Sequence, residues 1–364
     1  MKKIMLVFGT RPDAIKMCPL VKELKTRAGA RVFVLLTGQH REMTAQVLGA
    51  FGIVPDANLD IMRENQTLFD ITAEILNKAP DIIKSFLPDI ILVHGDTTTA
   101  FAVSLAAFYL GVPIGHVEAG LRSGNLYSPF PEEYNRRAVS VAAKFHFAPT
   151  TAARDNLISE GINKKSILVT GNTAIDALKT TVREDFRHPE LEWAKGSDLI
   201  LVTAHRRENI GEKLENMLRA VLRIVHKFPR VKVIMPVHPN PKVSGTVEKI
   251  LGGKERIHLI PPVGPVEFHN ILARCRLVLT DSGGLQEEAP SLGKPVLVMR
   301  DTTERPEGVA AGTLRLVGTE TDGIYRNYAA LLCDSSAYEK MATAPNPYGD
   351  GRASERIADI LIGR

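Results

Sequence analysis

The sequence contains little that would support a secreted, membrane-spanning or zinc-dependent protein. Only three cysteines occur among 364 residues, and none has the CxxC or Cys/His spacing of a zinc site. Sparse, widely separated cysteines are typical of a reducing compartment, so we expect a cytosolic protein. The apolar run Ile4–Phe8 has too few residues for a signal peptide or a membrane span and predicts a buried strand.

Blocks of like charge and the glycines of a dinucleotide site are also missing. The formal net charge is only +5, and no run of Lys and Arg marks a nucleic-acid surface. No GxGxxG follows the first predicted strand, so nothing points to a nicotinamide dinucleotide. We therefore expect no nucleic-acid partner, no membrane association, no metal and no other cofactor.

The chain does contain a regular alternation of short apolar runs and amphipathic stretches. Continuous Val, Ile and Leu runs separated by helical spacing predict parallel strands that are buried on both faces. Two series of such runs predict two Rossmann-like, doubly wound α/β domains that face each other across a cleft. The expected domains are 1–175, joined by a C-terminal helix at 351–364, and 176–350, with a polar, patternless link near 182–197 or slightly before it.

The individual elements follow from the same pattern. The expected strands of the first series are 4–8, 32–36, 90–93, 113–117, 145–148 and 167–170. Those of the second series are 198–203, 231–236, 257–260, 276–280, 295–299 and 314–317. Helical spacing is clear at 97–110, 131–143 and 212–227.

Polar residues follow several of the first-series strands, and ligands of open α/β sheets gather at those carboxyl ends. Arg11 and Lys16 lie near a helix start, where two cations make sense if they meet an anion, although a solvated turn is the alternative. Asp96 could equally cap the next helix, whereas Glu118 ends a buried strand. Two carboxylates at nearby strand ends suggest acid–base chemistry.

The start of the helix expected at 131–143 carries more charge. Pro131 marks its beginning, and acidic residues suit the first turn of a helix. Glu132 and Arg136 lie four residues apart and so share a face, where a surface ion pair is the simpler interpretation.

Cationic side chains follow strands of the second series. His205, Arg206 and Arg207 come directly after 198–203, and no second ligand at a fitting spacing supports a metal role for His205. His238 also follows a strand, and a hydrogen-bonded structural histidine explains it about as well as a ligand role.

The sharpest signal is the run Thr280–Glu288. A strand ends, Gly283 and Gly284 remove side-chain bulk, and a helix begins, so backbone N–H groups there could bind a diphosphate. Ser282 adds a hydroxyl, and Glu288 could accept from both hydroxyls of a ribose. The polar loop 300–307 is equally well explained as a solvated turn or as the rim of a ligand site.

Together these segments resemble the non-hydrolysing UDP-N-acetylglucosamine 2-epimerases. They span residues 8 to 307, and their number and order make the resemblance specific. The matching pieces are FGTRPDAIKM, TGQHREM, HGDTTTA, HVEAGLRSGNLYSPFPEEYNRR, APT, VTGNTAIDAL, TAHRREN, VHPN and TDSGGLQEEAPSLGKPVLVMRDTTERPE.

The resemblance implies a glycosyltransferase-B-like fold, a homodimer and a substrate cleft between the domains. It implies reversible conversion of UDP-N-acetylglucosamine to UDP-N-acetylmannosamine, for bacterial surface polysaccharide precursors, by elimination and re-addition of UDP through a glycal. It assigns the diphosphate to Arg11, Ser282, Gly283 and Gly284, the ribose to Glu288, the uracil to Phe268, the sugar to Asp96, Glu118 and Glu132, and the rest of the site to Lys16, Arg136, His205 and Arg206.

Some members of that family are activated by a second UDP-N-acetylglucosamine. Gln39, Arg206 and His238 match that allosteric site, whereas Glu42 and Asn65 depart from the Gln and Arg expected there. Asp13 for the usual Glu and Phe130 for the usual Trp are milder departures.

Three alternatives remain at this point. A hydrolysing 2-epimerase shares many of these motifs but usually lacks the RPxAIK form seen at 11–16, and it would release UDP and N-acetylmannosamine. A glycosyltransferase of the same fold would need an acceptor, for which no signal is present. A non-catalytic nucleotide-sugar sensor would be favoured by loss of the three carboxylates, all of which are present.

Overall fold

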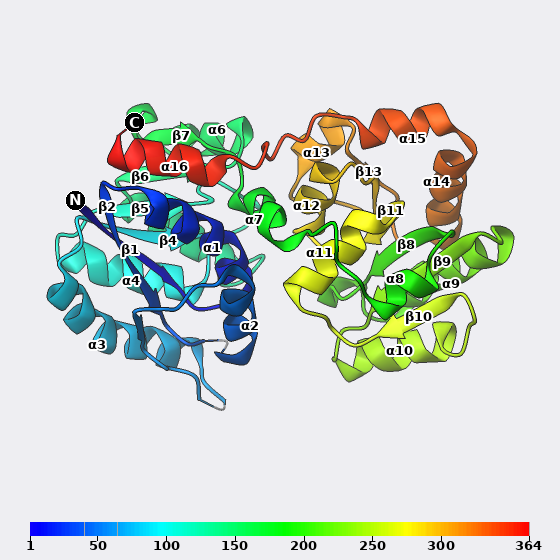
Figure 1. The fold of residues 1–364 in the computed structure, drawn as a ribbon, viewed down its shortest axis with the longest axis horizontal. Helices are drawn as coiled ribbons and strands as arrows, with labels where there is room; N and C mark the ends of the chain where they lie inside the picture. Colours follow the sequence, from blue (N-terminus) through cyan, green and yellow to red (C-terminus); the bar gives the residue numbers. More distant parts are fainter. Residues whose placement is uncertain (40, 64, 364) are drawn as a thin grey trace. The chain divides into compact units, whose positions relative to one another are not determined.

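The chain forms two compact α/β units, shown in Figure 1. The computed structural model describes residues 1–39, 41–63 and 65–363, without the side chains of Arg41, Glu42 and Arg207. Unit 1 comprises Met1–Thr180 and Tyr348–Arg364, and unit 2 comprises Thr181–Pro347. The expected pair of parallel α/β sheets is therefore confirmed.

Unit 1 is built on a seven-stranded sheet in the order β3-β2-β1-β4-β5-β6-β7, and every pairing between neighbours is parallel. The direction of winding reverses between β1 and β4, which is where ligands of doubly wound sheets bind. The strands are β1 (Lys2–Phe8), β2 (Ala30–Leu36), β3 (Ala57–Asn58), β4 (Ile90–His94), β5 (Ile114–Val117), β6 (Phe145–Ala148) and β7 (Ile167–Val169).

The continuous apolar strands bury both faces of this sheet, because alternate side chains point to opposite sides. On one face Ile4 and Leu6 of β1 pack with helices α1, α2 and α16, and on the other Met5 and Val7 pack with α3 and α4. The helical segments are α1 (Arg11–Thr26), α2 (Arg41–Phe51), α3 (Leu68–Phe86), α4 (Thr98–Tyr109), α5 (Glu132–Ala142), α6 (Thr151–Ser159), the 3₁₀ turn η1 (Lys164–Ser166), α7 (Thr173–Thr181) and α16 (Ala353–Ile362).

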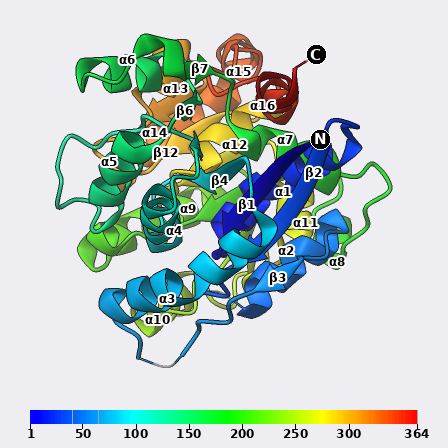
Figure 2. The same cartoon turned by 90° about the vertical axis from the view of Figure 1, so that its left-hand side faces the viewer.

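The C-terminal helix α16, drawn in dark red in Figure 2, belongs to unit 1. Ile357 and Leu361 are buried in the same core cluster as residues of α1. Asp176 of α7 accepts the backbone N–H groups of Ala353 at 3.2 Å and Ser354 at 2.8 Å, and so caps the start of α16.

Unit 2 repeats the same winding with six parallel strands in the order β10-β9-β8-β11-β12-β13. Its reversal point lies between β8 and β11, where Thr203 is in register with Thr280. The strands are β8 (Asp198–Thr203), β9 (Val231–Pro236), β10 (Ile257–Ile260), β11 (Leu277–Thr280), β12 (Val296–Val298) and β13 (Leu314–Leu316).

Helices cover both faces of the second sheet as well. Ile200 and Val202 of β8 pack on one side with α9, α10 and α14, while Leu199 and Leu201 pack on the other with α11 and α12. The helical segments are α8 (Pro189–Trp193), the 3₁₀ turn η2 (Arg207–Asn209), α9 (Glu212–Lys227), α10 (Pro241–Leu251), α11 (Pro265–Arg274), α12 (Leu285–Ser291), α13 (Pro306–Ala311), α14 (Thr321–Cys333) and α15 (Ser335–Ala342).

Two short elements were not among those expected from the sequence. The two-residue strand β3 was not expected, because two residues give no apolar run to recognise. The segment 182–197, expected as a polar and patternless link, contains α8, which begins at Pro189 after His188 accepts the N–H of Glu190 at 3.3 Å.

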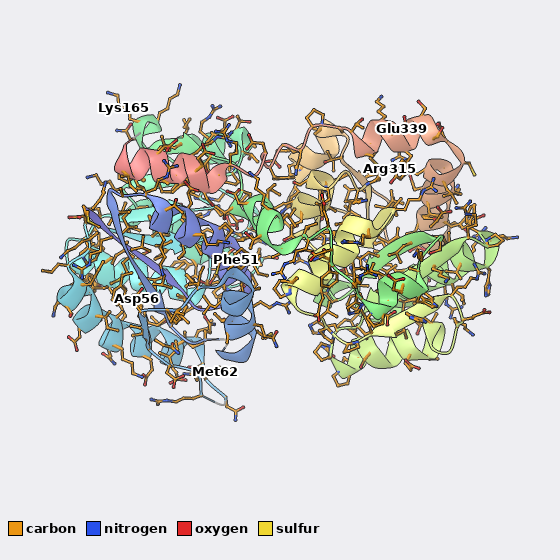
Figure 3. The ribbon with its side chains drawn as sticks, in the orientation of Figure 1. Phe51, Asp56, Met62, Lys165, Arg315 and Glu339 are labelled. Atoms are coloured by element: carbon orange, nitrogen blue, oxygen red, sulfur yellow. The ribbon has the colours of Figure 1, made fainter. Side chains whose placement is uncertain are left out.

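Side chains divide between core and surface in the usual way. Figure 3 labels Phe51, which is 4% exposed, and Lys165 and Glu339, which are exposed. None of the helices in the described part of the chain combines the length and the apolar character that crossing a bilayer requires.

Candidate active site

In unit 1 the predicted polar residues converge on the reversal point of the sheet. Glu118 follows β5 and adopts a left-handed backbone with φ of 62°, a conformation that non-glycine residues rarely adopt. Its side chain is 8% exposed, and its Oε2 atom pairs with Lys16 Nζ and accepts Asn172 Nδ2 at 2.8 Å. The strained backbone therefore aims this carboxylate at a cation and an amide rather than at water.

Burial alone would raise the pKa of Glu118, since it penalises the charged form. The positive charges of Lys16 and His94 outweigh that effect and hold the pKa of Glu118 well below its usual range. Glu118 is thus a buried carboxylate that stays ionised at neutral pH.

Two further members of this cluster were missed in the sequence. His94, the last residue of β4, lies with Nδ1 3.4 Å from Asp13 Oδ1 and with Nε2 3.6 Å from Glu118 Oε2. Burial lowers the pKa of His94, but Glu118 and Asp13 outweigh burial and raise it to about 9. In the sequence, only the positions of these two residues could have indicated a role in the site. His94 directly precedes the Gly95–Asp96 turn, and Asp13 lies in the first turn of α1.

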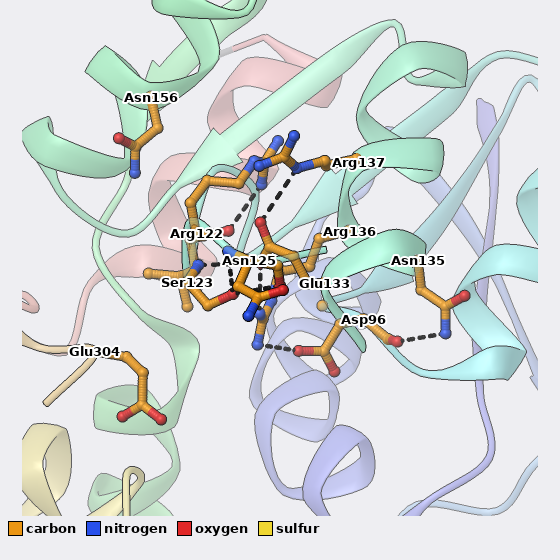
Figure 4. Close-up of polar contacts among 12 residues, drawn as sticks. Asp96, Arg122, Ser123, Asn125, Glu133, Asn135, Arg136, Arg137, Asn156 and Glu304 are labelled. Atoms are coloured by element: carbon orange, nitrogen blue, oxygen red, sulfur yellow. Dashed lines mark hydrogen bonds and ion pairs between the residues drawn. The ribbon is translucent and has the colours of Figure 1, made fainter. Parts of the chain in front are cut away.

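Asp96 does not cap the following helix, because Thr97 does so by accepting the N–H of Ala100 at 3.2 Å. The carboxylate of Asp96 instead pairs with the guanidinium of Arg136, as Figure 4 shows. Its backbone oxygen accepts Asn135 Nδ2 at 2.9 Å. Both the carboxylate and the backbone oxygen of Asp96 therefore contact α5. Because its side chain does not cap a helix, Asp96 stays a candidate catalytic residue.

The partner of Arg136 on its own helix is Glu133, not Glu132. Glu133 is fully buried and accepts Arg136 Nη1 at 3.2 Å, Arg137 Nε at 3.2 Å and the N–H of Ser123 at 3.1 Å (Figure 4). The Glu132 side chain makes no hydrogen bond or ion pair to any described residue, so the surface ion pair of the simpler interpretation does not form. The sequence spacing thus predicted an acidic partner for Arg136 on its own helix, but it selected Glu132 where the structure has Glu133.

The remaining sequence candidates of unit 1 lie at the start of α1 and after β2. Arg11 is the first residue of α1, whose N-cap is Thr10, and burial lowers the pKa of Arg11. Gln39 accepts the hydroxyl of Thr99 at 3.3 Å. The Glu42 side chain lies outside the described residues, and the allosteric site expected around Gln39 stays a prediction.

In unit 2 one fully buried carboxylate organises the reversal point. Asp281 follows β11 and accepts the backbone N–H groups of His205 at 3.0 Å and Arg206 at 2.9 Å, together with Asn209 Nδ2 at 3.1 Å. Thr203 and Thr280 share a hydroxyl hydrogen bond of 2.6 Å across β8 and β11. These bonds fix the direction in which the residues after β8 leave the sheet.

The two histidines predicted in unit 2 lie together. The rings of His205 and His238 stack with centroids 5.9 Å apart and an interplanar angle of 12°. Burial lowers the pKa of His205, although Asp281, 3.6 Å from its Nδ1, acts in the opposite direction. His205 is therefore a neutral imidazole at neutral pH, with 37% of its side chain exposed.

Two guanidiniums converge on the glycine turn after β11. A methyl group added at Gly283 would lie 3.2 Å from Arg206 Nη2 and 3.3 Å from Arg305 Nη1. Arg305 is held there by Glu287, which accepts its Nε at 2.8 Å. Backbone without side-chain bulk, flanked by two cations, is a suitable arrangement for an anion.

Ion pairs hold the loop 300–305 in place, while Asp301 within it is 61% exposed. Arg300 donates Nη1 to Glu304 at 2.7 Å, and only 11% of the Arg300 side chain is exposed. Burial would raise the pKa of Glu304, but Arg300 and Arg305 lower it to about 2. Arg305 was missed as a site candidate because nothing in the sequence shows that this loop folds back on Gly283.

Two candidates lie on the helices after the glycine turn and before β11. Glu288 of α12 has Oε2 3.5 Å from His269 Nε2, and the Nδ1 of that histidine is 2.8 Å from the hydroxyl of Thr181. Phe268 is partly buried against the core of unit 2. Within the described residues, no group of three His, Cys, Asp or Glu side chains has the arrangement of a metal site.

The two doubly wound parallel units place the chain among two-domain α/β proteins with a glycosyltransferase-B-like fold. Known proteins of closely similar sequence and structure narrow this class. The family model for UDP-N-acetylglucosamine 2-epimerase matches residues 22–362. The UDP-N-acetylglucosamine 2-epimerase of Bacillus subtilis is 57% identical over 99% of this chain and 95% of that protein.

Solved structures agree with the sequence match. The Neisseria meningitidis UDP-GlcNAc 2-epimerase, bound to UDP-GlcNAc, is 47% identical with a TM-score of 0.92 over 100% of both chains. The S. aureus MnaA structure with UDP is 52% identical with a TM-score of 0.91, over 99% of this chain and 96% of that one. The chain belongs to the UDP-N-acetylglucosamine 2-epimerase family.

Proposed function

We propose that the protein converts UDP-N-acetylglucosamine and UDP-N-acetylmannosamine into each other without hydrolysis, by elimination and re-addition of UDP through a glycal. The C2 hydrogen has no neighbouring carbonyl, so direct deprotonation would be very costly. Departure of UDP makes C1 oxocarbenium-like and the C2 hydrogen acidic. Return of UDP with a proton on the other face of C2 completes the inversion.

One observation carries this proposal most directly. Lys16, from the Arg11–Lys16 segment that distinguishes the non-hydrolysing enzymes in sequence, pairs with the buried carboxylate of Glu118. The segment is thus part of the carboxylate cluster and not a solvated turn. This supports a non-hydrolysing site in which Glu118 acts beside the sugar.

The departing diphosphate needs positive charge and N–H donors where negative charge develops. We assign this role to Arg11, Ser282, Gly283 and Gly284. The guanidiniums of Arg206 and Arg305 beside Gly283 support the assignment. Charge-assisted hydrogen bonds of this kind contribute about 1.5–3 kcal/mol each.

Proton transfer at two faces of C2 requires two groups, and we assign Asp96, Glu118 and Glu132 to this chemistry. Their surroundings differ, because Asp96 pairs with Arg136, Glu118 pairs with Lys16, and Glu132 has no partner among the described residues. We therefore assign the three carboxylates to C2 as a group, without dividing them between its two faces.

The decisive experiment incubates the protein with UDP-N-acetylglucosamine in heavy water and follows C2 by proton NMR. Elimination predicts UDP-N-acetylmannosamine with deuterium at C2, and deuterium also in the recovered substrate. Accumulation of free N-acetylmannosamine and UDP would instead identify a hydrolysing enzyme. Epimerisation with the original hydrogen kept at C2 would exclude the elimination route with solvent exchange.

Amide variants test the three carboxylates. Asp96→Asn, Glu118→Gln and Glu132→Gln should each lower kcat while UDP binding, measured by calorimetry, changes little; a positioned general base contributes about 10²–10⁴-fold. The matched control is Asp155→Asn, which alters an exposed carboxylate on α6 and should leave kcat unchanged. Normal turnover in all three amide variants would contradict the assignment.

A further inference from the structure

His94 is a buried titratable group that the proposed chemistry does not use. Its side chain is 4% exposed at the end of β4, and each ring nitrogen faces a carboxylate. Nδ1 lies 3.4 Å from Asp13 Oδ1, while Nε2 lies 3.6 Å from Glu118 Oε2 and has no hydrogen-bond partner among the described residues. A buried nitrogen without a hydrogen bond is costly unless its environment compensates.

The groups around His94 compensate by charge. Asp13 and Lys16 come from α1, and Glu118 comes from the end of β5. On β5 itself, burial lowers the pKa of His116 to about 3, so that ring is neutral and bonds to the Gly95 oxygen at 2.7 Å. With His94 protonated, the cluster holds two anions and two cations.

Asp13 is fixed independently of the histidine. Its Oδ2 accepts the hydroxyl of Thr97 at 3.2 Å, and its backbone N–H is capped by Thr10. Asp13 is 3% exposed. A carboxylate anchored in this way can hold one ring nitrogen of His94 and so set the orientation of the other.

The two oxygens of Glu118 have different surroundings. Oε2 faces Lys16, Asn172 and His94 together. Oε1 instead faces Gly95, where a methyl group in place of the glycine hydrogen would lie 3.6 Å away. The cluster therefore immobilises one oxygen and leaves the other on the side of the β4 turn that carries Asp96.

We propose that His94, oriented by Asp13, is a positioning residue for Glu118: its imidazolium keeps that carboxylate ionised and holds Oε2, so that Oε1 is the oxygen presented to the sugar. This inference rests on the proposed function, because it assigns a role to Glu118 in the reaction. His94 itself touches no reacting atom. The raised pKa of His94, about 9, agrees with a ring that stays protonated at neutral pH.

The pH dependence of the reaction is the property that separates positioning from mere packing. The positive charge of His94 is lost as pH rises through about 9, so kcat should fall there. Removing that charge should also raise the pKa of Glu118, because an opposite charge at this distance lowers a carboxylate pKa by about 1–3 units. A plot of kcat against pH should therefore depend on His94 at both ends: in its acidic limb, through Glu118, and in its basic limb, near pH 9.

The test measures kcat against pH for the wild-type protein and His94→Gln, whose amide keeps polar contacts without charge. We expect kcat to fall by less than the ~10²–10⁴-fold attributed to a general base. The acidic limb should move up by about 1–3 pH units, and the limb near pH 9 should disappear. The matched control His226→Gln, an exposed site on α9, should reproduce the wild-type profile.

Two variants at Asp13 keep the inference testable if His94→Gln does not fold. Asp13→Asn should lower the pKa of His94 and move the basic limb to lower pH, whereas Asp13→Glu keeps the charge and should leave that limb in place. Unchanged limbs in His94→Gln or in Asp13→Asn would overturn the positioning role. If the wild-type protein itself does not epimerise UDP-N-acetylglucosamine, the proposed function fails instead.

Discussion

Asp281 shows how one buried carboxylate can organise a binding site. Its oxygens accept the N–H groups of His205 and Arg206, together with the side-chain amide of Asn209. An amide in place of this carboxylate would turn a donor toward these donors. We expect Asp281→Asn to lower the free energy of unfolding by about 1–3 kcal/mol, measured by urea denaturation, and to weaken UDP binding.

A surface carboxylate provides the control for this prediction. Asp322 pairs with Arg223 at 2.5 Å on the surface, and its side chain is 73% exposed. Asp322→Asn should change stability by no more than about 0.5 kcal/mol. Equal effects of the two substitutions would mean that Asp281 does not fix the residues after β8.

The residues that sequence reasoning found and those it missed differ in a physical way. Glu118 and the Ser282–Gly284 turn were recognisable because they directly follow apolar strands. His94 was not, because its significance depends on Asp13, which lies far away in sequence and reaches it only after β1 and β4 pair. Local spacing likewise favoured Glu132 as the partner of Arg136, whereas burial selects Glu133.

Among the elements, α16 offers a sharp test of how the C-terminal segment stabilises unit 1. Ile357 is fully buried against α1, and Asp176 caps the helix start. We expect Ile357→Ala to lower the free energy of unfolding by about 2–5 kcal/mol, because a large buried side chain leaves a cavity. Chemical denaturation measures this change.

Ile360, on the same helix, is the matched control because it is 36% exposed. Ile360→Ala should cost only about 0.5 kcal/mol. A similar loss in both variants would indicate that α16 unfolds separately from the core of unit 1.

Most strands were predictable because a strand that is buried on both faces has a continuous apolar sequence. The expected 198–203, 231–236 and 257–260 match β8, β9 and β10 as observed. The exceptions are elements whose stability comes from contacts and not from their own pattern. The strand β3 exists because Ala57 and Asn58 pair with the edge of β2, and α8 covers only one turn.

At the scale of the whole molecule, two cores and two reversal points support a division of labour between the units. The described ion-pair clusters of Glu118 and Asp96 lie within unit 1, and those of Asp281 and Arg305 lie within unit 2. The expected domain extents, the homodimer and the allosteric site all stay predictions. The homodimer depends on contacts between two copies of the chain, and analytical ultracentrifugation would measure it by sedimentation.

The division of labour predicts where UDP protects the backbone. Hydrogen exchange in the presence of UDP should slow at 203–206, 281–286 and 300–305 of unit 2, and at the Arg11 turn if that residue shares the diphosphate. Uridine, which lacks both phosphates, should protect these segments much less, because the guanidiniums of Arg206 and Arg305 beside Gly283 would have no anion to bind. Equal protection by uridine and UDP would place the binding energy in the nucleoside, and the glycine turn after β11 would then not be the diphosphate site.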